Sequence, residues 1–136
     1  MPLTMGELRK AMNSELKTSV LPILREHFFK GSFPHFRRSR GNGIDLLTFQ
    51  FDKYGGGFVI EIARCAADGI TTHWGRHIPP SKVCAWDVND RQRITPQRGS
   101  GRDRWFRFDQ GNLKDAALSL LDHLPMAEAW WQNHNA

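Results

Sequence analysis

The 136-residue sequence predicts one α+β domain, residues 1–136. In this fold an antiparallel sheet of about four or five strands carries a long N-terminal helix and two C-terminal helices on one face. Three observations predict it. Apolar residues recur at helical spacing near the N-terminus, alternate with polar residues in the middle of the chain, and return to helical spacing after residue 112.

The N-terminal pattern predicts a long helix. Thr4 and Glu7 have the spacing of a capping box, which satisfies backbone N–H groups at a helix start. The apolar residues that recur after them are Leu8, Met12, Leu16, Val20, Leu24 and Phe28. Pro22 interrupts this pattern. We therefore expect either a kink or a second helix start, with Thr18 or Ser19 as its N-cap and the proline in its first turn.

The stretch FPHFRRSR predicts a short strand. Its alternation places Arg37 and Ser39 on the face away from Phe36, Arg38 and Arg40. The Gly-Asn-Gly sequence at residues 41–43 then signals a turn to the next strand.

Two longer strands meet at three glycines, Gly55 to Gly57, in the stretch FQFDKYGGGFVIEI. Residues on both sides alternate and are rich in β-branched and aromatic side chains, which is typical of strands. A glycine-rich loop that cradles a phosphate leads into a helix, whose backbone N–H groups face the anion. Because a strand ending near Cys65 follows here, we predict a hairpin bend at positions that need positive φ, and no anion site.

The C-terminal half is predicted to contain a long loop, a strand and two helices. Residues 66–101 are rich in Gly, Pro, Asp and Asn, with one strand around Val83 to Val88, and RWFRF at 104–108 alternates as a further strand. Asn112 can cap a helix, and Pro125 ends that helix or starts the next one. The predicted apolar face of the first helix is Leu113, Ala116, Ala117, Leu120, Leu121 and Leu124. The final helix, MAEAWWQN, is expected to fold Trp130 and Trp131 onto the body of the domain.

The net charge of +5 is located in one segment of the chain. Six arginines and one acid, Asp103, lie in residues 91–107, whereas the remainder has 13 basic and 13 acidic residues and is neutral. Arginine's planar fork suits carboxylates, phosphates and protein interfaces, and Trp and Arg are enriched at binding hot spots. We therefore predict a partner-binding site formed by Trp86, Arg91, Arg93, Arg98, Arg102, Arg104, Trp105 and Arg107.

Two other uses of this segment stay open. Its arginines could contact phosphates while its tryptophans stack on bases, as in nucleic-acid-binding proteins. Alternatively, some arginines could only brace the loop against the acids at positions 87, 90 and 103. Since Arg104 and Arg107 fall on opposite faces of their predicted strand, only part of the cluster is expected to converge.

The chain lacks the motifs of a metal site or an enzyme. Cys65, His73, His77 and Cys84 could supply zinc ligands, but structural zinc sites bring their ligands in tight pairs, so no metal is predicted. Two isolated cysteines are typical of reduced thiols. The serines lack a nucleophile elbow and the carboxylates are scattered without a pairing spacing. We expect no catalytic residues and no cofactor.

Several stretches in order resemble a bacterial family, domain of unknown function 4304. They are HFFKGSFPHFRRS, LLTFQFDKYGGGFVIEI, VCAWDVNDRQRI and the RWFRF before a leucine-rich helix. The resemblance spans nearly the whole chain. It implies a compact α+β fold and no transferable catalytic residues, and it suggests a partner role in toxin and immunity systems.

These observations lead to one leading hypothesis about function. The N-terminus lacks an apolar signal region, and no apolar run approaches the roughly 20 residues that cross a bilayer, so we expect a cytoplasmic protein without membrane contact. We expect a non-enzymatic, immunity-like protein that binds and blocks a toxin with an acidic surface. The alternative is a nucleic-acid-binding module that uses residues 91–107.

Overall fold

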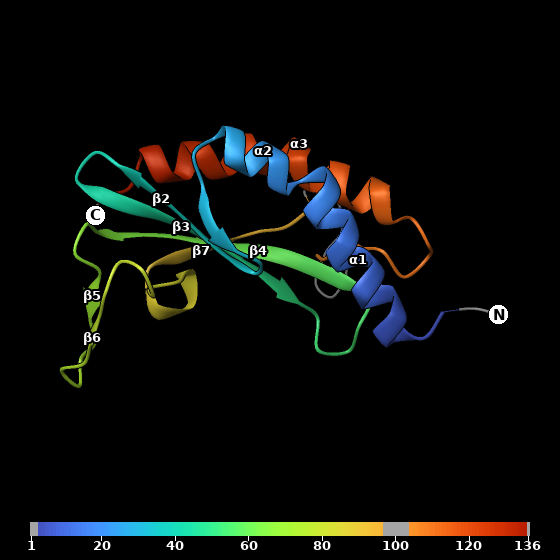
Figure 1. Ribbon diagram of the computed structural model, residues 1–136, viewed down its shortest axis with the longest axis horizontal. Helices are drawn as coiled ribbons and strands as arrows, with labels where there is room; N and C mark the ends of the chain where they lie inside the picture. Colours follow the sequence, from blue (N-terminus) through green and yellow to red (C-terminus); the bar gives the residue numbers. More distant parts are fainter. Residues whose placement is uncertain (1–2, 97–103, 136) are drawn as a thin grey trace.

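The computed structural model describes residues 3–96 and 104–135. Within these residues, three α-helices lie over one face of a six-stranded sheet, and a small two-stranded hairpin projects from its other side (Figure 1). The helices and strands, in chain order, are α1 (Met5–Ser19), α2 (Leu21–Glu26), β1 (Lys30–Ser32), β2 (His35–Arg40), β3 (Gly43–Phe51), β4 (Gly57–Ala66), β5 (Ile70–Thr71), β6 (His77–Ile78), the 3₁₀ helix η1 (Ala85–Asp87), β7 (Arg91–Ile94), β8 (Phe106–Arg107) and α3 (Leu113–Gln132).

The sheet is antiparallel throughout, in agreement with the predicted α+β class. Its strand order is β1-β2-β3-β4-β7, and β8 pairs with the first residues of β4. The turn at residues 41–42 joins β2 to β3, and Gly55 and Gly56 lie in the bend between β3 and β4, which begins at Gly57. The hairpin predicted for the glycine stretch is therefore confirmed. At Gly56, φ is +82° and an added Cβ would lie 2.9 Å from the Cβ of Asp109, so the bend needs glycine there.

Strand alternation divides the apolar residues into two clusters. The larger one lies between the sheet and the α-helices and buries Leu47, Phe49, Phe58 and Ile60 against Met12, Leu16, Leu120 and Trp131. The smaller one lies on the opposite sheet face and includes Ile44, Leu46, Ala63 and Val83. We call this opposite side the far face. Because this apolar cluster is small, polar and aromatic side chains occupy much of the far face.

The N-terminal helical pattern ends earlier than its spacing predicts. Thr4 and Glu7 form the predicted capping box, and Pro22 lies in the first turn of α2 as expected. The N-cap of α2 is Val20, and not Thr18 or Ser19. The helix ends at Glu26, so Phe28 is exposed and Phe29 enters the core instead.

The prediction of two C-terminal helices was wrong, because α3 continues through Pro125. The proline removes one backbone hydrogen bond, but Ala127 and Trp131 beyond it are buried against the sheet and hold the helix in place. On the N-terminal side of the proline, the predicted apolar face of α3 does contact the core.

The loop from residue 66 to residue 101 was also predicted incompletely. Residues 83–88 contain η1 and no strand, and residues 91–94 form β7, which sequence reasoning left in a loop. Three of the four β7 residues are exposed and polar, so the strand carries almost no alternation signal. The strand predicted over residues 104–108 is present as the short β8.

No helix among the described residues has the length and the apolar run that a transmembrane span needs.

Candidate functional site

The predicted binding residues that the structure describes come from several separate elements. Arg91 and Arg93 lie in β7, Trp86 in η1, and Arg107 in β8. Trp105 directly precedes β8. Arg98 and Arg102 lie outside the described residues.

A row of polar side chains crosses four strands on the far face. The strand register aligns His35 of β2 with Thr48 of β3, Thr48 with Glu61 of β4, and Glu61 with Arg93 of β7. The His35 Nδ1 atom lies 3.0 Å from Thr48 Oγ1, and Arg93 contacts the Glu61 carboxylate at 3.0 Å. Thr48 and Glu61 are buried, whereas His35 and Arg93 lie at the accessible ends. Burial and the nearby Arg37 lower the pKa of His35, which therefore favours its neutral form.

One tryptophan lies at each end of this row. The Trp86 ring meets His35 edge-on, with 5.1 Å between the ring centroids, and Trp86 is 45% exposed. The Arg93 guanidinium lies 5.4 Å from the centroid of the half-buried Trp105 ring. An added Cβ at Gly57 would approach the Trp105 Cβ to 2.8 Å, so the last of the three glycines makes room for this ring. The arrangement gives the far face two aromatic side chains separated by an ion pair.

Two arginines fasten the loop that carries Trp86. Arg91 donates to the backbone carbonyls of Trp86 and Val88, at 3.0 and 3.2 Å. From β2, Arg37 donates to the carbonyl of Val83 at 2.9 Å. Arg91 therefore positions the loop, but through backbone carbonyls and not through the acids considered in the bracing alternative.

Arg107 contacts residues outside the row, whereas Arg104 lies beside its Arg93 end. Arg107 lies 3.5 Å from the Asp52 carboxylate and also donates to the carbonyl of Gly55, so it binds β8 to the β3–β4 bend. Arg104 is exposed and lines a hollow of about 550 Å³ together with Arg93 of β7 and Trp130 of α3. Among the described arginines of the segment, Arg107 is therefore turned to the β3–β4 bend, and Arg93 and Arg104 border one hollow.

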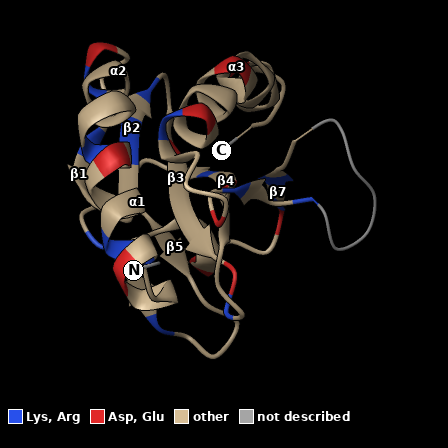
Figure 2. Cartoon of the chain, turned by 90° about the vertical axis from the view of Figure 1, so that its right-hand side faces the viewer, with Lys and Arg blue, Asp and Glu red and all other residues tan. Residues whose placement is uncertain are grey.

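Acids from other parts of the chain reduce the charge of the arginine segment. Arg93 and Arg107 each pair with a carboxylate that lies outside residues 91–107. In Figure 2 the basic and acidic residues are interspersed along the described chain.

Sequence reasoning missed Trp74. This residue lies between β5 and β6, is 68% exposed, and shares with Trp86 the lining of a hollow of about 490 Å³. Arg76, Asp87 and Asn89 supply polar groups to the same hollow. The only signal in the sequence is a large aromatic residue in a polar loop that offers no strand or helix to bury it.

The described residues offer neither a reactive thiol nor a metal centre. Burial raises the pKa of Cys65 to about 11 and also raises that of Cys84, so both sulfurs stay protonated at neutral pH. Among the residues that the structure describes, no three His, Cys, Asp or Glu side chains are grouped closely enough to hold a metal ion. His73 and His77 are exposed residues of the β5–β6 region.

A family model described as domain of unknown function (DUF4304) matches residues 8–133. The chain therefore belongs to this family. No curated protein and no solved structure matches the chain.

Proposed function

We propose that this DUF4304 domain is a non-enzymatic binding module that captures a partner protein with the far face of its sheet. In the form we favour, it is an immunity-like inhibitor that blocks a toxin in the cytoplasm. One observation carries the proposal. Trp86, Arg93 and Trp105 come from separate segments and gather on the far face, while the α-helices cover the other face.

The fixed position of Trp86 suits a binding anchor. Trp and Arg dominate interface hot spots, and an anchor that is already ordered loses little side-chain entropy on binding. Trp86 meets these conditions because Arg91 holds its backbone and the His35 ring contacts its side chain. The exposed part of the indole is then available to a pocket on the partner.

A partner with an acidic surface fits the remaining charge of this region. Arg76 and Arg91 are both exposed, and neither has an ion pair with an acid among the described residues. Basic side chains around an aromatic anchor steer an acidic partner and set the register of the complex.

The polar groups of the far face support binding more than catalysis. The Glu61 carboxylate is buried and engaged by Arg93, and the His35 ring is bonded to Thr48. The thiols of Cys65 and Cys84 are protonated at neutral pH. These engaged groups suit a binding role, because a general base or a nucleophile needs a free reactive group with access to a substrate.

The test is capture of a partner by the purified chain from a lysate of its own source, followed by binding measurements on the isolated pair. Trp86→Ala is expected to weaken the complex by about 2 kcal/mol, or about 30-fold. Lys10→Ala, on the exposed side of α1, is the matched control and is expected to change little. Thermal melting of each variant checks the folded fraction. A stoichiometric partner that binds wild type and Trp86→Ala equally would refute the far-face site.

A second candidate, single-stranded nucleic acid, is favoured by the hollow between Trp74 and Trp86. Two exposed tryptophans beside Arg76 could stack on bases and contact a phosphate. Such binding falls log-linearly with salt because it releases counterions. Titration with single- and double-stranded DNA and RNA at several salt concentrations separates the two functions. Submicromolar affinity at physiological salt that is lost in Trp74→Ala would favour nucleic acid over a protein partner.

A further inference from the structure

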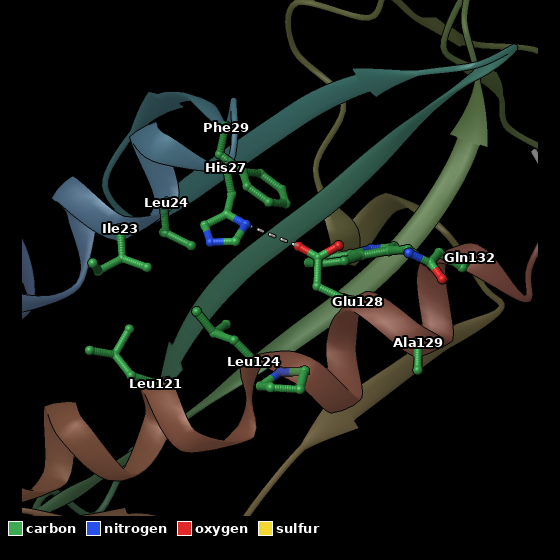
Figure 3. Close-up of a pocket in the computed structure, with 11 residues that line it drawn as sticks. Ile23, Leu24, His27, Phe29, Leu121, Leu124, Glu128, Ala129 and Gln132 are labelled. Atoms are coloured by element: carbon green, nitrogen blue, oxygen red, sulfur yellow. Dashed lines mark ion pairs between the residues drawn. The ribbon is translucent and has the colours of Figure 1, made fainter.

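Two hollows of the described chain differ in their chemistry. The groove between α2 and α3 is lined mainly by aliphatic and aromatic side chains (Figure 3). Its carboxylate, Glu128, already accepts two hydrogen bonds from Arg38, so a ligand there would gain mainly apolar contact. The hollow between Trp74 and Trp86 instead combines aromatic surface with several polar groups. A site of this mixed kind defines the chemistry of its ligand more closely.

Both tryptophans of this hollow lie on segments that are fixed to the domain. The β5–β6 hairpin packs on the small apolar cluster of the far face through Ile70 and Ile78, and Val88 after η1 packs on the same cluster. The hairpin and η1 lie on the same side of the sheet (Figure 1). The hairpin turn is closed by a hydrogen bond of 2.8 Å from the Thr72 N–H to the Arg76 carbonyl. Because both segments are ordered before binding, the hollow loses little conformational entropy when it takes a ligand.

The tryptophans give the hollow an uncovered apolar surface. Trp74 is 68% exposed and Trp86 is 45% exposed. Each indole meets a histidine ring at close to a right angle, 87° for His73 on Trp74 and 86° for His35 on Trp86. The hollow measures about 490 Å³, within the range of about 300 to 1,000 Å³ that is usual for ligand pockets. A ligand with an apolar face would therefore gain free energy by covering the indoles.

The polar groups of the hollow include both donors and acceptors. Arg76 only donates, the Asp87 carboxylate only accepts, and the side-chain amide of Asn89 does both. One Asp87 oxygen accepts a hydrogen bond of 2.9 Å from the Cys84 N–H, and the carboxylate keeps further lone pairs for a ligand. With His73 neutral, the charges of Arg76 and Asp87 cancel among the described residues that line the hollow.

This lining disfavours charged ligands and ligands that only accept hydrogen bonds. A phosphate group would be repelled by Asp87, and an ammonium group would be repelled by Arg76. A proline-rich segment presents carbonyl acceptors but few N–H donors, so it would leave Asp87 without a partner. Hydroxyl groups both donate and accept, and they can therefore satisfy Arg76, Asp87 and Asn89 together.

We propose that the hollow binds an uncharged pyranose sugar. An apolar C–H face of the ring lies against Trp74 and Trp86, and the hydroxyl groups at its rim bond Arg76, Asp87 and Asn89. The sugar site does not rest on the proposed function, because it needs no protein partner. The charge balance that favours a sugar also counts against a phosphate backbone in this hollow, so binding of nucleic acid becomes an alternative outcome of the test.

The proposal is tested on the full chain by calorimetry and by saturation-transfer NMR. The probes are methyl β-glucopyranoside, N-acetylglucosamine, methyl α-mannopyranoside and methyl β-galactopyranoside. Saturable binding of at least one probe is expected, with a dissociation constant in the millimolar range or tighter and the strongest saturation transfer to C–H protons on one face of the ring. Because an uncharged ligand releases no counterions, this affinity is expected to change less than about twofold with salt. Absence of saturable binding by every probe would overturn the proposal, as would binding of a deoxythymidine oligonucleotide in their place.

Three variants locate the sugar. Trp74→Ala is expected to weaken binding by about tenfold or more, and the fold is retained because most of this side chain is already in water. Tyr54→Ala removes an aromatic side chain that is 81% exposed outside the hollow, and as the matched control it is expected to leave binding unchanged. Arg76→Gln keeps a donor but removes the charge, and it is expected to change sugar binding less than about threefold.

The variants also separate a sugar from a ligand held by charge. Equal weakening in Trp74→Ala and Tyr54→Ala would contradict the location of the site. A loss of about tenfold in Arg76→Gln would contradict an uncharged ligand, since the substitution removes the cation and keeps hydrogen-bonding capacity. Because Trp74 is not part of the polar row on the far face, its variant tests the sugar site independently of a protein partner.

Discussion

Replacing Phe28 with glycine is expected to stabilise the protein, although it deletes a large apolar side chain. Phe28 is the first residue after the C-cap of α2, where the chain leaves the helix with a φ of +71°. The Phe28 N–H bonds the carbonyl of Arg25, and the Phe29 N–H bonds that of Leu24, each at 3.0 Å. These two bonds define a Schellman motif, in which glycine is the usual residue at this position.

The expected gain follows from three contributions. Relief of the left-handed conformation returns about 1 to 2 kcal/mol for a residue with a Cβ. The greater freedom of glycine in the unfolded chain costs about 0.5 to 1 kcal/mol. Loss of the side chain costs little, because 78% of the residue surface is already in water. The net gain is about 0.5 to 1 kcal/mol, which at this chain length corresponds to a rise in melting temperature of about 2 to 4 °C.

The control is Phe28→Ala, which removes the ring but keeps the Cβ and therefore the strain. Thermal melts and urea titrations of the three proteins compare their free energies of unfolding. Phe28→Ala is expected to be no more stable than wild type, and Phe28→Gly more stable than both. If Phe28→Gly melts at or below the temperature of Phe28→Ala, the strain argument is refuted.

Four further predictions concern the core and the far face. Gly56→Val is expected to destabilise the fold by about 2 kcal/mol or more in urea titration, with or without nucleotide, whereas Gly111→Ala, which keeps a positive φ without a clash, costs less. Asp45→Asn removes the buried charge that Arg38, Arg40 and Arg64 share, and is expected to lower the free energy of unfolding by about 3 to 5 kcal/mol. Asp68→Asn, at an exposed position, is the control. Iodoacetamide at pH 8 is expected to alkylate Cys65 only when the native structure opens, because the thiol is buried and its pKa is raised to about 11, and rapid labelling located at Cys65 in the native protein would contradict this. Because the native pKa of His35 is lowered, the unfolded state binds more protons just below pH 6.5, so stability should fall as pH drops through that window, and His35→Gln should flatten the slope of melting temperature against pH.

Local signals in the sequence were sufficient to predict the elements that are determined by residues close together in the chain. The capping box at Thr4, the alternation of β3 and β4, and the glycine bend between them all depend on residues close in sequence. The end of α2 did not follow from spacing, because Phe28 continues the helical pattern that Leu24 belongs to. The Schellman motif overrides this pattern and turns Phe29 into the core in its place.

The elements that were missed depend on tertiary contacts. Strand β7 has one buried side chain, Ile94, and is held by pairing with β4. Helix α3 continues past Pro125 because the residues after it are buried against the sheet. The spacing of apolar residues in one sequence reveals neither the pairing of β7 with β4 nor the burial of the residues after Pro125.

The charge clusters were beyond sequence reasoning for a related reason. Asp45 meets Arg38 and Arg64 only because β2, β3 and β4 pair in one register, and Glu128 joins from a helix about 90 positions away from Arg38. A shift of one residue in that register would turn Asp45 to the far face and separate it from these partners. The sequence contains the residues of this cluster but not the alignment that assembles it.

The same pairing changes how the excess charge should be interpreted. In the sequence, all five positive charges fall in residues 91–107, which favours a partner held by charge. In the fold, Glu61 and Asp52 neutralise two of those arginines, and Arg91 is bonded to backbone carbonyls. Since paired arginines contribute little to long-range steering, affinity on the far face should depend more on the aromatic anchor Trp86 than on the number of basic residues. A partner that binds there must therefore offer an apolar pocket for the indole, with acidic groups around the rim of that pocket.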